Sequence, residues 1–298
     1  MQPIVILGPT AAGKTKLAVE LAKQLGGEII SADSMQVYRG MDIGTAKPTM
    51  EERQGVPHHL IDVRDPDQEW TVSDFVEQTN QLTDQLAAWG KAPIIVGGTG
   101  LYLWSLLEGF AFPLSPADKE LRARLELEST SILYSRLSTI DPPAAAKIHA
   151  NDKKRIIRAL EVYELTGQPI SKLQELRTSN VEHRTSKYLL IGLDPPREEL
   201  YKNINKRVDT MLEKGLVEEV KGLREKGYGK DIFSMQALGY KEVFEYLDGH
   251  WTLDFLTAEL KKRTRHFARR QMTWFRRFKE VKWFPPSGTD KIYGIIAS

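Results

Sequence analysis

The segment VILGPTAAGKTKLAVELA, residues 5–22, constrains the fold more than any other part of this sequence. It contains GPTAAGKT at 8–15, which fits the pattern G-x-x-x-x-G-K-[ST] at every fixed position. The apolar run 3–7 before it predicts a buried parallel strand, and apolar residues at helical spacing from 17 to 25 predict a helix after it. A strand, a glycine-rich turn and a helix in this order predict a phosphate-binding loop.

The residue types in this loop explain how it would hold a phosphate group. Backbone N–H groups of residues 10–15 would converge on the anion at the start of the helix. Lys14 would add a positive charge, and the Thr15 hydroxyl could be a ligand for Mg²⁺. By motif alone this is a nucleotide-binding, ATP-binding loop, but a diphosphate presents the same oxygen geometry, so the ligand stays open. The residues expected in the loop are Gly8, Thr10, Ala11, Ala12, Gly13, Lys14 and Thr15.

Strand and helix patterns alternate along much of the chain. Further strands are predicted at 26–34, 58–63, 92–98 and 187–194, with a helix at 72–89. This alternation predicts an α/β fold, a P-loop NTPase-like parallel sheet flanked by helices on both faces. The C-terminal third predicts more helices, at 197–214, 216–226, 238–247 and 254–280.

Residues 113–186 have no convincing strand pattern, and we expect an all-helical insertion domain there. One helix is predicted to begin at Pro116 and Asp118, and one or two more to lie within 142–167 and end at Gly167. The catalytic core is then discontinuous, formed by residues 1–112 and 187–298.

Composition excludes several classes of protein. The 298 residues include no cysteine, so disulfides, thiolate zinc sites and cysteine nucleophiles are excluded. Residues 92–112 are apolar apart from Glu108, but GGTG at 97–100 interrupts them, which favours a strand, a turn and a buried helix over a membrane span. The N-terminus lacks the basic region of a signal peptide. We therefore expect a cytoplasmic enzyme.

Two polar residues follow predicted strands at the edge where a P-loop fold binds its ligand. Asp33 comes after the second strand, and its carboxylate could take a proton from an attacking hydroxyl or amine; alternatively it caps a turn through Ser34. Thr99 could bond to a diphosphate oxygen or a leaving group, or simply satisfy local backbone. No convincing Walker B carboxylate appears, although Asp62 is a candidate.

Two basic clusters point to nucleic acid. Residues 261–282 are rich in Lys and Arg and carry Phe267, Trp274, Phe275 and Phe278. A second cluster, KKRIIR, lies at 153–158 in the predicted insertion. Phosphate contact and base stacking need such residues. A single cluster is more often a solvated helix face, but two clusters favour RNA binding, although the net charge is only +2.

Several motifs, in order from residue 8 to residue 277, resemble those of bacterial tRNA dimethylallyltransferases, also called tRNA isopentenyltransferases. The motifs are GPTAAGKT, ISADSMQVYRGMDIGTAKP, VPHHLID, IIVGGTGLYL, NDKKRIIRALE, ALGYKE and RRQMTWFRR. The resemblance implies transfer of a dimethylallyl group from dimethylallyl diphosphate to N6 of adenosine 37 in tRNAs that read codons beginning with U. It also implies a loop that holds diphosphate rather than ATP, Mg²⁺ as cofactor, and an insertion that grips the anticodon stem-loop.

The resemblance also implies roles for individual residues. Asp33 resembles the general base, Thr99 the threonine beside the leaving diphosphate, and Arg207 an arginine that reaches this diphosphate. Positions that resemble tRNA contacts are Asp33, Ser34, Met35, Gln36, Thr99, Arg122, Lys154, Arg155, Ile156, Ile157, Arg158, Arg270, Gln271, Trp274 and Arg276.

Other functions share parts of this pattern. A small-molecule kinase could use the same loop and Asp33, and ATP binding without dimethylallyl diphosphate binding would favour it. Prenylation of free AMP or ATP is a variant that the basic helices argue against. A non-catalytic RNA-binding module would not need Lys14, Thr15 and Asp33 together. We expect tRNA and dimethylallyl diphosphate as partners, no membrane, and a monomer.

Overall fold

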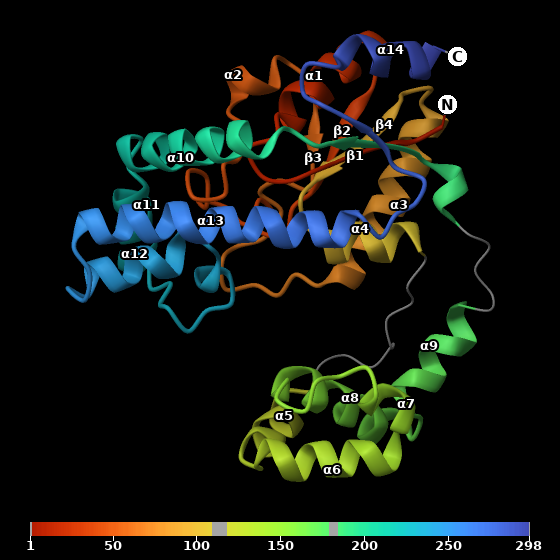
Figure 1. Ribbon diagram of the computed structural model, residues 1–298, viewed down its shortest axis with the longest axis vertical. Helices are drawn as coiled ribbons and strands as arrows, with labels where there is room; N and C mark the ends of the chain where they lie inside the picture. The colour runs from red at the N-terminus through yellow and green to blue at the C-terminus, as the bar shows by residue number, and fades with distance from the viewer. Residues whose placement is uncertain (1, 109–117, 179–183, 298) are drawn as a thin grey trace. The chain divides into compact units, whose positions relative to one another are not determined.

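The computed structural model describes residues 2–108, 118–178 and 184–297 (Figure 1). The chain forms two compact units, one from residues 1–104 and 185–298 and one from residues 105–184. Each unit is described by itself. The first contains the sheet and the glycine-rich loop, and the second is helical.

The first unit is built on a six-stranded parallel sheet in the order β3-β2-β4-β1-β5-β6. The parallel P-loop sheet predicted from the sequence is therefore confirmed. The strands are β1 (Ile4–Leu7), β2 (Glu28–Ala32), β3 (His58–His59), β4 (Pro93–Gly97), β5 (Leu189–Leu193) and β6 (Lys282–Phe284).

Two strands differ from the sequence prediction. β3 is shorter than expected, because Leu60 and Asp62 have positive φ angles and turn the chain out of the sheet. β6 was not predicted, since three residues are too few to show an alternating pattern. It forms where Trp283 packs over Gly192, a position at which a Cβ atom would overlap the indole ring.

Helices cover both faces of the sheet, as predicted (Figure 1). On one face Ile4, Ile6 and Ile94 share a buried cluster with residues of α1 and with Ile292 of α14. On the other face α3 packs against β2 and β4. The helices of this unit are α1 (Lys14–Leu25), α2 (Met50–Arg53), α3 (Val72–Ala88), α4 (Gly100–Leu107), α10 (Arg197–Glu213), α11 (Leu216–Glu225), α12 (Tyr240–Leu247), α13 (Leu253–Phe275) and α14 (Thr289–Ala297). The last residues of α4 fall in the other unit.

The apolar stretch 92–112 forms a strand, a turn and a helix in its described part, β4 followed by α4, as expected. Residues 109–112 lie outside the described residues. Among the helices of the described ranges, none is both long and apolar enough to cross a membrane.

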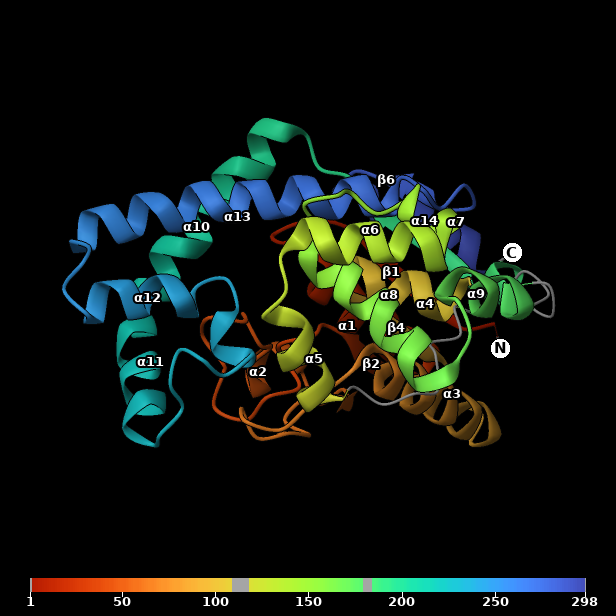
Figure 2. The same cartoon turned by 90° about the horizontal axis from the view of Figure 1, so that it is seen from below.

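α13 is the longest helix of the first unit and lies beside α10 (Figures 1 and 2). It also packs against α12, which packs against α11. α13 ends at Phe275, before the predicted end at 280, because the chain turns through Phe278 into β6. Neither α2 nor α14 was predicted.

The second unit consists of helices around a leucine- and isoleucine-rich core. Asp118 caps the first helix by accepting a hydrogen bond from Leu121 N at 3.0 Å, as expected, while Pro116 lies outside the described residues. Gly167 ends α8 at a φ of 68°, also as expected. α6 and α9 were not predicted. The helices are α5 (Lys119–Glu126), α6 (Thr130–Ile140), α7 (Pro142–Ala145), α8 (Lys153–Thr166) and α9 (Ile170–Thr178).

A buried carboxylate ties α5 to α8. The side chain of Glu161 is fully buried and accepts hydrogen bonds from Asp118 N at 2.8 Å, from Arg122 Nε at 2.8 Å and from Arg158 at 2.6 Å. Burial alone would raise the pKa of Glu161, but the bonds from Arg122 and Arg158 and from the Asp118 backbone lower it below 4.5 overall. The ionised form is thus the one that the fold stabilises.

We expect Glu161→Gln to destabilise the helical unit by about 2 kcal/mol, because it removes charge-assisted bonds. Hydrogen exchange of the α5 and α8 amides in the full chain measures the loss. Glu126→Gln, at an exposed ion pair, is the control and should have little effect. In the wild type, protection should be complete above pH 4.5 and lost as the pH falls through the lower folded-state pKa. Equal protection in both variants would contradict this role.

Candidate active site

The loop from Gly8 to Thr15 joins β1 to α1 and has the backbone geometry of a phosphate-binding loop. Gly8 has a φ of +149°, and a Cβ atom there would lie 2.6 Å from the carbonyl oxygen of Leu193 on β5. Gly13 caps α1 at a φ of 89°. Ala11 also has a positive φ, 64°, which a residue with a Cβ atom adopts only when its surroundings hold it there. The loop is thus fixed against the neighbouring strand.

Two cations reach this loop. Lys14 Nζ donates to the carbonyl oxygen of Pro9 at 2.8 Å, and Arg207, on α10, donates from its guanidinium to Thr10 Oγ1 at 3.1 Å. Burial, together with the charge of Arg207, lowers the pKa of Lys14 to about 7, although Asp33 opposes the shift. Burial also lowers the pKa of Arg207, which remains charged because its ordinary value is so high. An anion in the loop would stabilise both charges.

Asp33 follows β2 and faces the same loop. Its Oδ1 accepts hydrogen bonds from Met35 N at 2.9 Å and Gln36 N at 3.3 Å. Burial raises its pKa, although these bonds and the Lys14 charge act in the opposite direction. Asp33 therefore caps the turn, through Met35 and Gln36, and is also a carboxylate whose proton affinity is increased, so the two interpretations made from the sequence are compatible.

Thr99 joins the turn after β4 to the turn after β2. Its Oγ1 accepts a hydrogen bond from Ser34 N at 3.1 Å, and its backbone N–H donates to Ala32 O at 3.3 Å. The hydroxyl therefore lies beside the segment that begins with Asp33, although the two residues come from strands that are far apart in sequence.

Gln271 on α13 joins the glycine-rich loop to the end of β4. Its Oε1 accepts a hydrogen bond from Thr10 N at 2.8 Å, and its Nε2 donates to Gly98 O at 2.8 Å. Gln271 as a whole residue is 5% exposed. A Cβ atom at Gly98 would overlap this amide, and one at Gly100 would lie 2.7 Å from Trp274. The glycines of GGTG therefore allow α13 to approach the strand ends.

The bridging role of Gln271 was not predicted; the sequence suggested an RNA contact at this position. The signal that could have revealed it is spacing, because Gln271 lies between Ala268 and Phe275 on the buried side of α13. A polar residue at such a position requires hydrogen-bond partners.

Many of these residues line one cavity of about 700 Å³ in the first unit, whereas the predicted site residues Gly8, Ser34, Met35 and Thr99 do not. Residues from four regions meet there: the loop at 10–15, the turn after β2, the segment 42–49, and α10 with α13. The site residues predicted from the sequence that line it are Thr10, Ala11, Ala12, Gly13, Lys14, Thr15, Asp33, Gln36, Arg207 and Gln271. Within the described ranges, no group of three or more His, Cys, Asp or Glu side chains could hold a metal ion.

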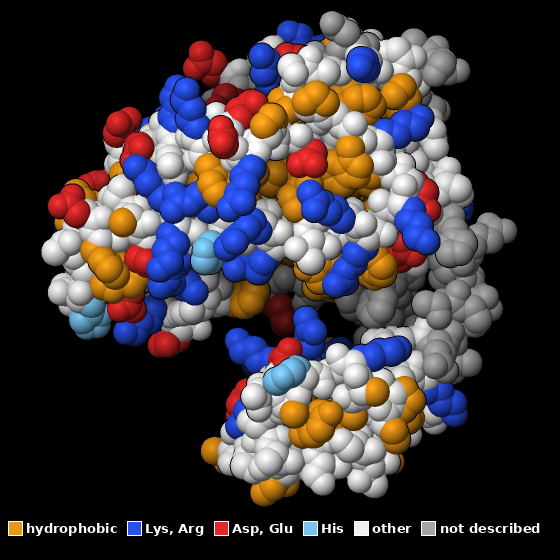
Figure 3. Space-filling model, viewed as in Figure 1, with side chains coloured by type: hydrophobic (Ala, Val, Ile, Leu, Met, Phe, Trp, Pro, Cys, Tyr) orange, Lys and Arg blue, Asp and Glu red, His pale blue; other side chains and the backbone are white. Residues whose placement is uncertain are grey.

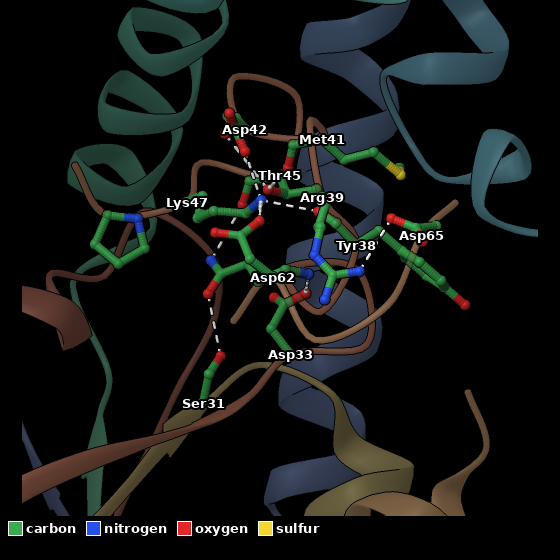
Figure 4. A network of polar contacts seen from close by, with 12 residues as sticks. Ser31, Asp33, Tyr38, Arg39, Met41, Asp42, Thr45, Lys47, Asp62 and Asp65 are labelled. Carbon is green, nitrogen blue, oxygen red and sulfur yellow. Dashed lines mark hydrogen bonds and ion pairs between the residues drawn. The ribbon is translucent and has the colours of Figure 1, made fainter. Parts of the chain in front are cut away.

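A polar network forms one wall of this cavity (Figure 4). Lys47, whose side chain is 4% exposed, donates to Asp42 at 2.5 Å, to Asp62 at 2.6 Å and to Tyr38 O at 2.8 Å. Asp62, considered as a Walker B carboxylate, is therefore paired with Lys47.

Of the predicted RNA contacts in the first unit, Asp33 to Gln36, Thr99 and Gln271 lie at the cavity or the turns beside it, whereas Arg270, Trp274 and Arg276 lie on or near an exposed basic face. Arg270 and Arg276 of this face are exposed, whereas Trp274 is half-buried and packs edge-on against Trp104. Lys and Arg side chains gather over α10 and α13 on the face shown in Figure 3. Exposed Lys and Arg residues of these two helices and of the two positions after α13, which we call the basic face, include Lys202, Lys206, Lys262, Arg269, Arg270, Arg276 and Arg277.

In the helical unit, the predicted contacts divide by burial. Lys154 and Arg155 are exposed, but Ile156 and Ile157 pack in the core, so their side chains cannot reach an RNA. Arg122 and Arg158 are bonded to Glu161. Their guanidinium groups are partly exposed, and contact with RNA stays a prediction.

We expect the pKa of Lys14 to control anion binding. The charged amine binds an anion, so the affinity of the wild type for inorganic diphosphate, relative to Lys14→Met, should be greatest below pH 7. It should fall by up to about tenfold per pH unit above this value. Lys14→Arg keeps its charge and should show no such loss. Calorimetric titrations from pH 6 to 9 measure the ratio, and a constant ratio would contradict the low pKa.

Comparison with known proteins agrees with this geometry. A family model described as IPP transferase matches residues 36–278. The tRNA dimethylallyltransferase of Acetivibrio thermocellus is 52% identical, and the alignment covers 98% of this chain and 94% of that protein. The tRNA dimethylallyltransferase of Pelotomaculum thermopropionicum is 48% identical over 94% of this chain and 89% of that protein.

Solved structures agree as well. The full-length tRNA isopentenylpyrophosphate transferase of Bacillus halodurans has a TM-score of 0.73 at 44% identity, with 100% of this chain and 96% of that chain covered. A eukaryotic dimethylallyltransferase acting on tRNA has a TM-score of 0.84 at 30% identity, with 95% of this chain and 73% of that chain covered. This chain therefore belongs to the tRNA dimethylallyltransferase family, and is an enzyme of the prenyltransferase class.

Proposed function

We propose that this enzyme transfers a dimethylallyl group from dimethylallyl diphosphate to N6 of adenosine 37 in tRNAs that read codons beginning with U. The bond from C1 of the donor to its diphosphate oxygen breaks, a bond from C1 to N6 forms, the N6 proton goes to a base, and diphosphate is released. The observation that carries the proposal is that a phosphate loop with two cations and a carboxylate with a raised pKa line one cavity.

The loop and its cations suit a leaving diphosphate. Negative charge develops on the oxygen that departs, and fixed donors in a buried site stabilise such charge strongly. Lys14 and Arg207 are held by protein contacts before any ligand binds. Of the loop N–H groups, that of Thr10 already donates to Gln271 and that of Ala12 to Pro9 O. We assign Gly8 and the residues from Thr10 to Thr15, with Arg207, to diphosphate binding.

Asp33 is suited to act as the general base that accepts the N6 proton. An exocyclic adenine amine is a poor nucleophile, so its proton must be removed as the new bond forms. Burial raises the pKa of Asp33, which strengthens it as a base. Thr99, bonded to Ser34, lies at the junction of the two turns and is assigned to the leaving group and the acceptor.

The residues present are compatible with Mg²⁺. Thr15 lines the cavity, and its hydroxyl is an oxygen donor of the kind that suits this ion. With no cluster of three acidic or histidine side chains among the described residues, the substrate phosphates and water would supply most ligands. When bound, the ion would neutralise charge on the departing diphosphate.

The basic face of the first unit and the helical unit are assigned to the anticodon stem-loop. Exposed arginines with nearby aromatic rings suit contact with phosphates and unstacked bases. Arg277 lies 4.7 Å above the ring of Trp274. The adenine must leave its stack to reach the cavity. We also propose that the enzyme is a monomer and, because tRNA is its proposed substrate, that it acts in the cytoplasm.

We expect Asp33→Asn to slow transfer at least about 100-fold, because the amide cannot accept the N6 proton. RNA affinity should change less than about twofold, since the side chain is nearly the same size. The assay uses anticodon stem-loop RNA and labelled dimethylallyl diphosphate, with and without Mg²⁺. Wild-type transfer should rise with pH through the raised Asp33 pKa, because the carboxylate form is the base. Asp67→Asn, at an exposed site, is the control; full activity of Asp33→Asn would disprove the assignment.

We expect Arg270→Ala and Arg276→Ala each to weaken RNA binding and to reduce its dependence on salt. The slope of log K against log salt concentration should fall by about 1 for each phosphate contact that a substitution removes. Lys226→Ala removes an exposed charge beyond α11 and is the matched control. Slopes equal to that of the wild type would remove both arginines from the interface.

A further inference from the structure

The segment from Asp42 to Gly44 is held by one carboxylate from a distant helix. Glu219, on α11, accepts hydrogen bonds at Oε2 from Asp42 N at 2.9 Å and Ile43 N at 2.7 Å. Its Oε1 accepts from Gly44 N at 3.1 Å and from the hydroxyl of Tyr240 at 2.6 Å. A carboxylate has about four acceptor positions, so these four bonds saturate it.

Close packing fixes the same point. Tyr240 is fully buried at the start of α12, and a Cβ atom at residue 44 would overlap its ring. Gly44 is therefore required by the tyrosine that shares Glu219. The motifs MDIGTAKP and ALGYKE, which are far apart in the sequence, meet here. The motif ALGYKE has no role in the phosphate loop or in the base Asp33.

A chain of contacts leads from this point to the base. Thr45 and Ala46, which follow the segment, accept hydrogen bonds from Gln36 Nε2 at 3.3 and 3.4 Å. Gln36 also accepts from Ser31 Oγ at 3.1 Å, and its backbone N–H donates to Asp33 at 3.3 Å. The segment that Glu219 holds is thus bonded to the residue that orients the carboxylate.

The same segment forms a wall of the cavity. Asp42, Ile43, Thr45, Ala46 and Lys47 all line it, whereas Glu219 does not. Three successive backbone N–H groups often bind an anionic ligand. Here the carboxylate of Glu219 occupies the position of such a ligand. Glu219 therefore fixes the cavity wall without touching a substrate.

We infer that Glu219 is a positioning residue for the acceptor side of the reaction: it fixes the segment 42–46, and through Gln36 the carboxylate of Asp33, against the target adenine. This inference rests on the proposed function. The inferred role concerns the acceptor side alone, because Glu219 has no described contact with the diphosphate loop.

The test compares Glu219→Gln with Glu218→Gln, its exposed neighbour on α11. In Glu219→Gln an amide group replaces one acceptor oxygen, so the three N–H groups and Tyr240 can no longer all be satisfied. We expect kcat for transfer to stem-loop RNA to fall about 10- to 100-fold, since small displacements of reacting groups have effects of this size. Affinity for inorganic diphosphate should stay within about twofold of the wild type. Glu218→Gln should match the wild type in both.

A double variant tests whether Glu219 acts through Asp33. In an Asp33→Asn background, Glu219→Gln should lower kcat little further, because the group that it positions is already lost. A purely structural effect would lower kcat by the same factor in both backgrounds, and that result would overturn the inference. Parallel loss of diphosphate affinity would also overturn it.

Tyr240→Phe covers the case in which Glu219→Gln does not fold. It removes one of the four bonds and keeps the ring against Gly44, so kcat should fall about 2- to 5-fold with diphosphate affinity unchanged. If the wild type is active, an unchanged kcat in Glu219→Gln overturns the role of Glu219. If Glu219→Gln does not fold, an unchanged kcat in Tyr240→Phe overturns it. If the wild type transfers no dimethylallyl group, the proposed function fails instead.

Discussion

The site depends on how closely α13 approaches the carboxyl ends of β1 and β4. The amide of Gln271 makes this approach possible, because it satisfies Thr10 N and Gly98 O at the same time. Buried backbone groups that lack partners are costly, so a helix could not lie there without such a side chain. The same approach requires glycine at 98 and 100. The helix with the basic face is thereby bonded directly to the phosphate loop.

Burial acts in opposite directions on the two reacting sides of the cavity. It lowers the pKa of Lys14 and raises that of Asp33, so each group is less strongly charged than in water. The cations of the phosphate loop suit the diphosphate of the proposed donor, and the carboxylate of Asp33 suits the amine of the proposed acceptor.

Much of this architecture could be predicted from the sequence, because local signals are strong where the chain must satisfy its own backbone. Glycines at 8 and 13 and the run Ile4–Leu7 predict the loop and its strand, and Asp118 and Gly167 mark helix ends correctly. β6 and α14 were missed because each depends on packing against distant residues: Trp283 of β6 lies over Gly192, and Ile292 of α14 joins the core cluster of β1 and α1. Ile156 and Ile157 were grouped with basic neighbours, although helical periodicity turns them inward.

The sequence by itself determined the phosphate loop, the alternation of strands and helices from which the parallel sheet was predicted, and the family motifs, since these depend on residues that are close together in the chain. Only the tertiary structure decided that Gln271 bridges two strand ends, that Asp62 pairs with Lys47, and that Glu219 binds three N–H groups of a segment about 175 residues away. The reason is physical: a hydrogen-bond partner is chosen by proximity in space. A glutamate on an amphipathic helix has no local feature that distinguishes it from its exposed neighbours.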